Sequence, residues 1–191
     1  MDISALPTGN SKTALSYLHF PTVWQAVLWR NWGVVPQERL AMALQCTPEE
    51  ILHAGADLGL QPDDSLCPVW LERGYQTIIR QNWHLLSYEQ LLQPLGWTAE
   101  KLEYILREDD FLWHKLGGSK PQLCAPRFAP LSPAQARSTE QLRRWRQEAT
   151  GSLPERREAP FAFLEKSLGG PTTLAVASDS GLRMIYPYAA V

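Results

Sequence analysis

The sequence repeats itself at a spacing of fifty-one residues, and this repeat constrains the fold more than any other feature. Residues 24–32 (WQAVLWRNW) recur as residues 75–83 (YQTIIRQNW). Without a gap, the agreement continues at Glu38/Glu89, Leu40/Leu91, Leu44/Leu95, Thr47/Thr98, Glu49/Glu100 and Ile51/Leu102. Such periods are typical of chains built from repeated supersecondary units. We therefore predict two copies of one unit, repeat 1 at residues 22–60 and repeat 2 at residues 68–117.

Helix-start signals divide repeat 1 into three helices. Thr22, with Gln25 three residues later, has the spacing of a capping box, and Pro36 suits the first turn of a second helix. Residues 47–50 (TPEE) are the strongest start signal, with Thr47 as N-cap and Glu50 placed to bond back to the cap amide. A helix, a tight turn and a capped helix form a helix-turn-helix pair, which the first helix completes as a three-helix unit.

Repeat 2 predicts the same order of helices with other residues. Ser87 and Gln90 form a second capping-box pattern, Gly96 supplies the turn, and Thr98 caps the last helix. Lys101 stands where the reciprocal glutamate would be. We expect Pro94 to shorten or kink the middle helix.

The flanking segments differ in character from the repeats. Residues 1–21 are an N-terminal extension, and residues 118–173 form a Pro- and Gly-rich connector with a polar helix at 132–149. Residues 174–191 contain two apolar segments that predict strands, as at the start of a truncated β-containing domain. The expected fold class is mainly α: tandem helix-turn-helix-like repeats, a connector, one further helix and a short C-terminal β segment.

Composition argues for a soluble cytoplasmic protein. The formal net charge is −2 over 191 residues, which gives the whole molecule no attraction to phosphate backbones or anionic lipid. The three cysteines, Cys46, Cys67 and Cys124, are odd in number and widely spaced, which favours reduced thiols. No secretory leader or membrane-spanning run is visible, and we expect no membrane partner.

DNA recognition is the obvious hypothesis for a helix-turn-helix, and the charges argue against it. The candidate recognition helix of repeat 1 has Glu49, Glu50 and Asp57 and no Lys or Arg. That of repeat 2 has five acids, Glu100, Glu103, Glu108, Asp109 and Asp110, against two cations, Lys101 and Arg107. Because a DNA reader needs cations for phosphates, packing or protein contact is the better interpretation, and nucleic acid is not the expected partner.

A basic cluster near the polar helix leaves a nucleic-acid arm open as a weaker alternative. It comprises Arg137, Arg143, Arg144, Arg146, Arg156 and Arg157. Glutamates at 140, 148, 155 and 158 are interleaved with these arginines, and Glu140 and Arg144 have the favourable i,i+4 spacing. Such a mixture is typical of a solvated helix face.

The eight tryptophans raise a second hypothesis, carbohydrate stacking. Trp24, Trp32 and Trp83 occupy repeat positions on helix faces, where aromatic side chains are usually core. Trp97 and Trp113 are the better candidates for exposure. Together with nearby acids they form the predicted partner-contact set: Trp97, Glu100, Asp109, Asp110 and Trp113.

No motif in the sequence predicts catalysis, a metal or a cofactor. His19, His53, His84 and His114 lack zinc-ligand spacing with one another and with the cysteines. Asp109 and Asp110 are neighbours on a helix and point about 100° apart, whereas general acid–base catalysis needs carboxylates facing one substrate. Cys46 precedes a helix N-terminus, which favours a thiolate, but Trp97 at the equivalent position makes packing an equal explanation.

Several segments resemble the N-terminal region of large, uncharacterised bacterial proteins in which a glycoside-hydrolase-like barrel follows. They are residues 30–36 (RNWGVVP), 82–86 (NWHLL), 95–98 (LGWT), 106–117 (LREDDFLWHKLG) and 182–188 (LRMIYPY). The resemblance implies that the barrel would lie beyond Val191 and that this chain is a fragment. It carries over no catalytic residue.

These observations predict a non-catalytic accessory or scaffold module of a glycoside-hydrolase-like protein. Its expected partner is the downstream domain of the same polypeptide or another protein. The alternative is a transcription regulator that binds DNA through one helix-turn-helix unit. The sequence does not define an oligomeric state.

Overall fold

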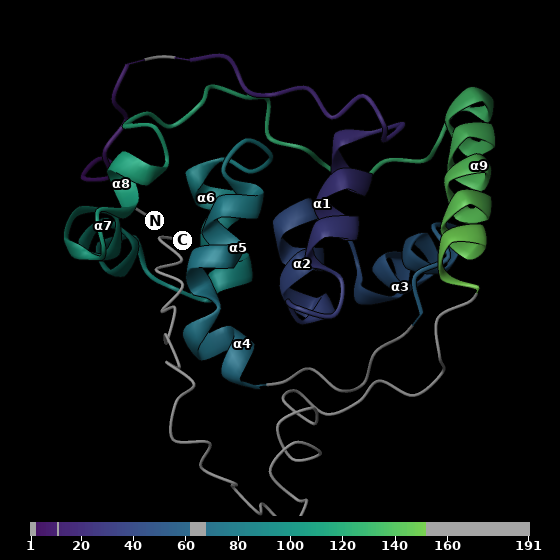
Figure 1. The fold of residues 1–191 in the computed structure, drawn as a ribbon, viewed down its shortest axis with the longest axis horizontal. Coiled ribbons are helices and arrows are strands. Elements are labelled where there is room, and N and C mark those ends of the chain that lie inside the picture. Colours follow the sequence, from purple (N-terminus) through teal and green to yellow (C-terminus); the bar gives the residue numbers. More distant parts are fainter. Residues whose placement is uncertain (1–2, 11, 62–67, 152–191) are drawn as a thin grey trace, which may run out of the picture. The chain divides into compact units, whose positions relative to one another are not determined.

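The computed structural model describes residues 3–10, 12–61 and 68–151, and these are almost entirely helical or connecting chain (Figure 1). The first unit contains α1 (Val23–Asn31), α2 (Gln37–Leu44) and α3 (Pro48–Asp57). The second contains α5 (Tyr75–Asn82), α6 (Tyr88–Leu95) and α7 (Ala99–Glu108). Three helices lie outside this scheme: α4 (Pro68–Arg73), α8 (Leu112–Lys115) and α9 (Pro133–Thr150). The predicted mainly α fold with tandem helical units is confirmed.

The two units use the same helix boundaries. Shifting α2 and α3 by fifty-one residues reproduces the bounds of α6 and α7, and α5 corresponds to all but the first residue of α1. The turns agree as well: Gln45 and Gly96 both end their helices in the left-handed region, at φ of 59° and 63°. The sequence offset is therefore also an offset of secondary structure.

Side-chain caps begin most of these helices, as the sequence predicts. Both halves of a capping box are present at Thr47/Glu50, Ser87/Gln90 and Ser132/Gln135. Thr98 caps α7 through the Lys101 amide without a reciprocal bond. Each cap satisfies backbone N–H groups that have no partner inside the helix.

The predicted capping box at Thr22 forms only in part. The Thr22 hydroxyl accepts a hydrogen bond from the Gln25 amide, so the cap itself exists. The Gln25 side chain does not bond back to the Thr22 backbone amide in the described structure; its Nε2 donates to Thr139 Oγ1 of α9 at 2.8 Å. Gln25 Oε1 accepts a hydrogen bond from the Thr22 hydroxyl at 3.1 Å, so the side chain has both a local and a tertiary partner.

The expectation that Pro94 shortens α6 is wrong. Both α6 and its counterpart α2 have eight residues, and Pro94 lies inside α6 one residue before its end. A proline this close to a helix end disturbs only the last turn. The carbonyls of Pro94 and Leu95 accept hydrogen bonds from the Arg39 guanidinium at 3.3 and 3.2 Å, which satisfies backbone groups at that end.

One hydrophobic core serves both units. Its largest fully buried side chains come from each of them: Leu28, Leu40, Leu44, Ile51 and Leu58 from the first, and Ile78, Ile79, Trp83, Leu91 and Leu92 from the second. α2 packs against α6, and α1 against α5, so two of the three helices in each unit contact their counterparts. The tandem units therefore face one another rather than stacking in one direction.

The connector is more closely packed than its proline and glycine content suggests. The Phe128 amide donates to the Leu44 carbonyl at 2.9 Å, and the Phe128 ring packs on Trp24 with centroids 4.9 Å apart. The N-terminal segment crosses the same chain, with bridges at Gly9/Ser119 and Thr13/Gln122. α9 then packs against α3. The strands predicted for residues 174–191 lie outside the described residues.

Candidate partner-contact surface

The exposed face of α3 is acidic. Glu49, Glu50 and Asp57 are exposed, as is His53, and α3 contains no Lys or Arg. The pKa of Glu49 is lowered, first by a backbone hydrogen bond and then by the Thr47 hydroxyl, so this carboxylate is charged at neutral pH. The exposed side of α3 therefore has the negative charge that the sequence predicts.

The exposed face of α7 carries cations, and acidic or aromatic neighbours engage both of them. Arg107 Nε lies 2.9 Å from Glu103 Oε1, one turn away on the same helix. The Lys101 ammonium lies over the Trp97 ring, 4.3 Å from its centroid. Glu100 and Glu108 are exposed beside them. We call Glu49, Glu50 and Asp57 of α3, with Glu100, Glu103 and Glu108 of α7, the acidic faces.

The two predicted acids after α7 are held in place by different partners. Asp109 Oδ2 accepts hydrogen bonds from the Tyr75 hydroxyl at 2.5 Å and from Gln76 Nε2 at 3.2 Å. The bond from Tyr75 to Asp109, together with burial, raises the pKa of the Tyr75 phenol. Asp110 forms an ion pair with Lys115 at 2.6 Å. The carboxylates therefore bond to separate partners. The expectation that both are neighbours on the helix is wrong, because α7 ends at Glu108 and the backbone at Asp109 is extended.

The chain turns sharply between α7 and α8. Asp110 and Phe111 both lie in the left-handed region, at φ of 46° and 54°. This conformation is uncommon for a bulky residue. The Phe111 side chain is 74% exposed, so its burial does not compensate for the strain. Strained backbone of this kind concentrates at functional positions.

The expected exposure of Trp97 and Trp113 is only partly observed. Both are half-buried: Trp97 packs on Tyr75 with centroids 5.3 Å apart, and Trp113 meets Trp83 edge-on at 6.0 Å. Trp97 and Asp109 therefore share Tyr75 as a neighbour, whereas Trp113 belongs to the core around Trp83. Glu100 and Asp110 are exposed.

The most buried polar cluster lies where α1 meets α5. Asn31 and Asn82 are both fully buried, and each donates from Nδ2 to the other's Oδ1, at 2.8 and 2.7 Å. The same amide groups donate to the carbonyls of Val27 and Ile78, one turn back. The sequence shows Asn at equivalent positions of both copies, which was the available clue to this pair.

A buried lysine, which the sequence analysis missed, anchors the connector. Lys120 Nζ donates to the carbonyls of Trp83 and Leu86, at 2.7 Å each, and lies 4.8 Å from the Trp83 ring centroid. Burial lowers the pKa of Lys120 to about 8, against a smaller raising effect of Glu89. The sequence gave no sign that Lys120 is buried, because the residue lies in a connector of polar appearance.

Cys46, in the turn before α3, is a half-buried free thiol. Burial, with a smaller effect of Glu50, raises the pKa of Cys46 to about 11, so the packing interpretation of that thiol is supported over the thiolate one. No group of three or more His, Cys, Asp or Glu side chains in the described part of the chain could hold a metal ion. No helix found there is long and apolar enough to cross a bilayer.

No protein family, curated protein or solved structure matches this chain.

Proposed function

We propose that the chain is a non-catalytic accessory or scaffold module of a glycoside-hydrolase-like protein, and that it makes protein contacts through its acidic faces. The observation that carries the proposal is the charge of α3, which exposes Glu49, Glu50 and Asp57 and contains no Lys or Arg. α7 adds a smaller excess, with three acids against two cations. Figure 1 places α3 and α7 on opposite sides of the α1, α2, α5 and α6 helices. The module thus has two separate faces for contact with a neighbouring domain.

The internal structure supports a scaffold. A single core joins both units, and the connector and N-terminal segment are bonded across it. A body of this kind holds two surfaces at a fixed separation, which is what positioning a second domain requires. The preferred partner surface is cationic, because it must complement glutamate and aspartate side chains.

DNA binding is the alternative, and the contacts of α7 weigh against it. Of its two cations, Arg107 pairs with Glu103 and Lys101 lies over Trp97, so freeing either for a phosphate would break an existing contact. On α3 there is no Lys or Arg to offer. A helix entering the major groove needs such side chains to bind the phosphates that flank it.

The test compares this chain alone with a polypeptide that also carries a downstream barrel domain. We expect no glycan hydrolysis by the chain alone, and altered activity or substrate affinity of the barrel when the module is attached. Replacing Glu49 and Asp57 of α3, together with Glu100 and Glu108 of α7, by lysine should remove that effect, whereas Glu148→Lys on α9, also exposed, should leave it unchanged. Hydrolysis by the isolated chain, or an effect that survives the changes on both acidic faces, would overturn the proposal.

A further inference from the structure

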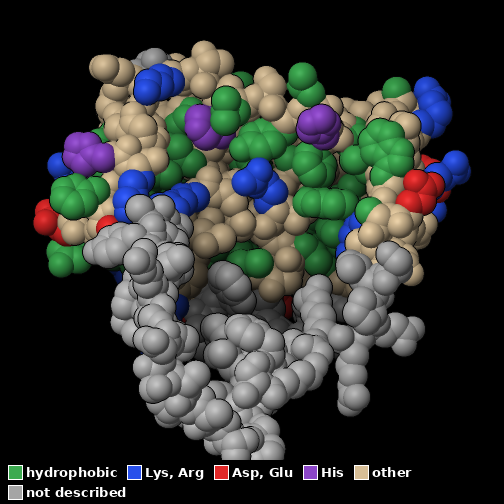
Figure 2. All heavy atoms as spheres, viewed as in Figure 1, with side chains coloured by type: hydrophobic (Ala, Val, Ile, Leu, Met, Phe, Trp, Pro, Cys, Tyr) green, Lys and Arg blue, Asp and Glu red, His purple; other side chains and the backbone are tan. Residues whose placement is uncertain are grey.

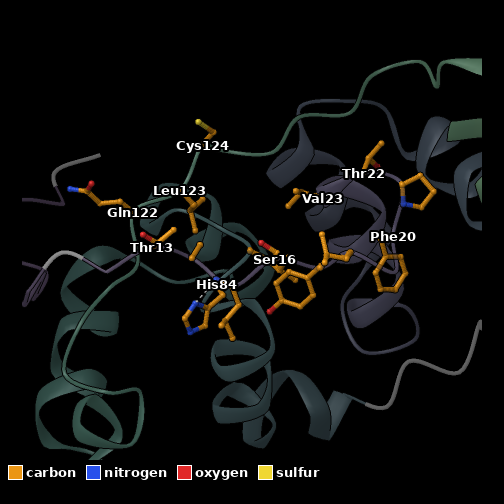
Figure 3. Close-up of a pocket in the computed structure, with 15 residues that line it drawn as sticks. Thr13, Ser16, Phe20, Thr22, Val23, His84, Gln122, Leu123 and Cys124 are labelled. Carbon is orange, nitrogen blue, oxygen red and sulfur yellow. Dashed lines mark hydrogen bonds between the residues drawn. The ribbon is translucent and has the colours of Figure 1, made fainter. Parts of the chain in front are cut away.

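Part of the N-terminal segment crosses the turn between α5 and α6, and we call residues 13–20 the strap. One end of the strap is fixed where Thr13 bridges Gln122 of the connector. The other end is fixed where the Phe20 ring meets Trp29 of α1 edge-on, with centroids 5.7 Å apart. A hollow of about 490 Å³ lies between the strap, that turn and the connector (Figure 3).

One hydrogen bond holds the middle of the strap. The Leu15 amide donates to Nδ1 of His84, in the turn, at 3.2 Å, and Figure 3 draws this bond as a dashed line. Among the described residues, no other hydrogen bond joins residues 15–20 to the rest of the structure. The side chains of Leu15, Leu18 and His19 are exposed and add little contact. Between its two ends, the strap therefore depends largely on His84.

A proton on His84 removes this hydrogen bond. A neutral imidazole accepts at one ring nitrogen, whereas an imidazolium donates from both and accepts at neither. Once Nδ1 carries a proton, the ring directs one N–H group at another, the amide of Leu15. The position of the strap over the turn therefore requires the neutral form of the ring.

The nearest cation also disfavours the charged ring. Lys120 Nζ donates to the carbonyls of Trp83 and Leu86, which lie on either side of His84 in the same turn. Burial, opposed by Glu89, lowers the pKa of Lys120 to about 8, so its ammonium group is charged at pH 7 and below. Burial of the imidazole, and then this ammonium group, lower the pKa of His84 below its ordinary value of 6.5.

No carboxylate among the lining residues of the hollow compensates for a charge on His84. That lining includes no Asp, Glu, Lys or Arg. Its other titratable groups are Tyr17 of the strap, whose ring lies 5.5 Å from the Arg30 guanidinium, and Cys124 of the connector. Phenols and thiols carry no charge at mildly acidic pH. Figure 2 shows acidic side chains mostly near the edges of this face, away from the two histidines at its centre.

We propose that the strap opens in acid: protonation of His84 breaks its hydrogen bond to Leu15, and residues 14–19 leave the turn and open the hollow. The open state binds the proton more tightly, because a freed imidazolium is hydrated and no longer opposes an amide N–H. A fall in pH therefore shifts the population toward the open state. The ends at Thr13 and Phe20 stay attached, so the change is confined to the strap. This inference does not depend on the proposed function.

Nuclear magnetic resonance of the full chain tests the proposal. From about pH 7.5 to about pH 5, the hydrogen-exchange protection factor of the Leu15 amide should fall about tenfold, the effect of one hydrogen bond. The heteronuclear NOE of the amides of residues 15–18 should fall with it, because the freed segment moves on the nanosecond timescale. The imidazole shifts of His84 report its protonation in the same samples. All three changes should follow one titration with a midpoint below pH 6.5.

Two matched histidine variants identify the responsible group. In His84→Asn, the asparagine Oδ1 stands at the position of Nδ1 and accepts from the Leu15 amide at any pH, so the strap should stay closed in acid. His19→Asn removes an exposed histidine of the strap itself and should open as the wild type does. Circular dichroism shows whether each variant is folded, which is expected because His19 is exposed and His84 only half-buried.

A third variant tests the same bond from its donor. Leu15→Pro removes the amide N–H, so the strap no longer favours the neutral ring and the pKa of His84 should rise toward 6.5. An unchanged pKa of His84 in this variant would contradict the proposal. A strap that stays protected at about pH 5 would overturn it, whatever the protonation state of His84. So would a His84→Asn variant that opens in acid like the wild type, because another group would then be responsible.

Discussion

Asn31 and Asn82, fifty-one residues apart, exchange two hydrogen bonds in the centre of the molecule. Each occupies the same position in its unit, and each also donates to the carbonyl one turn earlier in its own helix. The pair is therefore nearly symmetric, like a contact between the two subunits of a homodimer. Here the two subunits are halves of one chain.

A second pair of contacts follows the same symmetry. Arg39 of α2 donates to the Pro94 carbonyl of α6, and Gln90 of α6 donates to the Ala43 carbonyl of α2, at 2.8 Å. Positions 39 and 90, and positions 43 and 94, are equivalent at the repeat offset. The symmetry therefore extends from the asparagine pair along α2 and α6, although the two donor side chains differ chemically.

The asparagine pair makes a direct prediction for stability. Replacing Asn82 alone by leucine leaves the buried Asn31 amide without its reciprocal partner, and the free energy of unfolding should fall by about 2–3 kcal/mol. Replacing both by leucine removes the unpaired group as well, so the double variant should recover part of the loss. Urea unfolding of the two single leucine variants and of the double variant measures these free energies. A double variant that loses more stability than the two single variants lose together would contradict this account.

Lys120 predicts an unusual dependence of stability on pH. Its pKa is lowered from 10.5 to about 8 in the folded chain, so between these values the unfolded chain binds more protons. Stability should therefore rise with pH from about 8 toward 10, by up to about 3 kcal/mol for a shift of this size. Below pH 8 both states are protonated and this contribution is constant.

The control for that slope is Lys120→Met, which should lose the rise in stability; above pH 9.0 its stability should fall, because the pKa of Cys46 is raised from 9.0 to about 11 in the folded chain. The neighbouring Tyr88 phenol works in the opposite direction at higher pH, because burial raises its pKa and the folded chain resists its ionisation. Measurements should thus stop near pH 10, which is about the ordinary pKa of a tyrosine phenol. An identical slope in wild type and variant would show that Lys120 is not its source.

The left-handed backbone at Phe111 predicts a stabilising substitution. Glycine adopts φ near 54° without the steric cost that phenylalanine pays, and the exposed ring loses little packing. Phe111→Gly should therefore raise the free energy of unfolding by about 1 kcal/mol. Tyr104→Gly, at an exposed position inside α7, should lower it by about 1 kcal/mol instead. Thermal unfolding of the two variants distinguishes strain at position 111 from a general effect of glycine.

Local patterns in the sequence predicted the features that depend on neighbouring residues. The caps at Thr47 and Ser87 follow from spacings of three residues, and Gly96 ends α6 as expected. The repeat offset predicted that helices in the two units begin and end at equivalent residues. These features could be read because each depends on side chains and amides within one turn.

The features missed from the sequence arise from contacts between distant segments. Gln25 bonds to Thr139, more than a hundred residues away, in place of closing its own capping box. Lys120 is buried because the connector folds back on the turn between α5 and α6, and the half-burial of Trp97 depends on Tyr75. Composition assigns lysine to the surface and gives no means of finding such a partner.

Duplex binding at low ionic strength is the most direct test of the claim that the acidic faces meet protein and not phosphate. Anisotropy of a labelled DNA duplex should stay constant as the chain is added, at salt concentrations where phosphate contacts are strongest. A variant with lysine at Glu49, Asp57, Glu100 and Glu108 should bind measurably under the same conditions. Tight binding by the unmodified chain, weakening steeply as salt is added, would contradict the account.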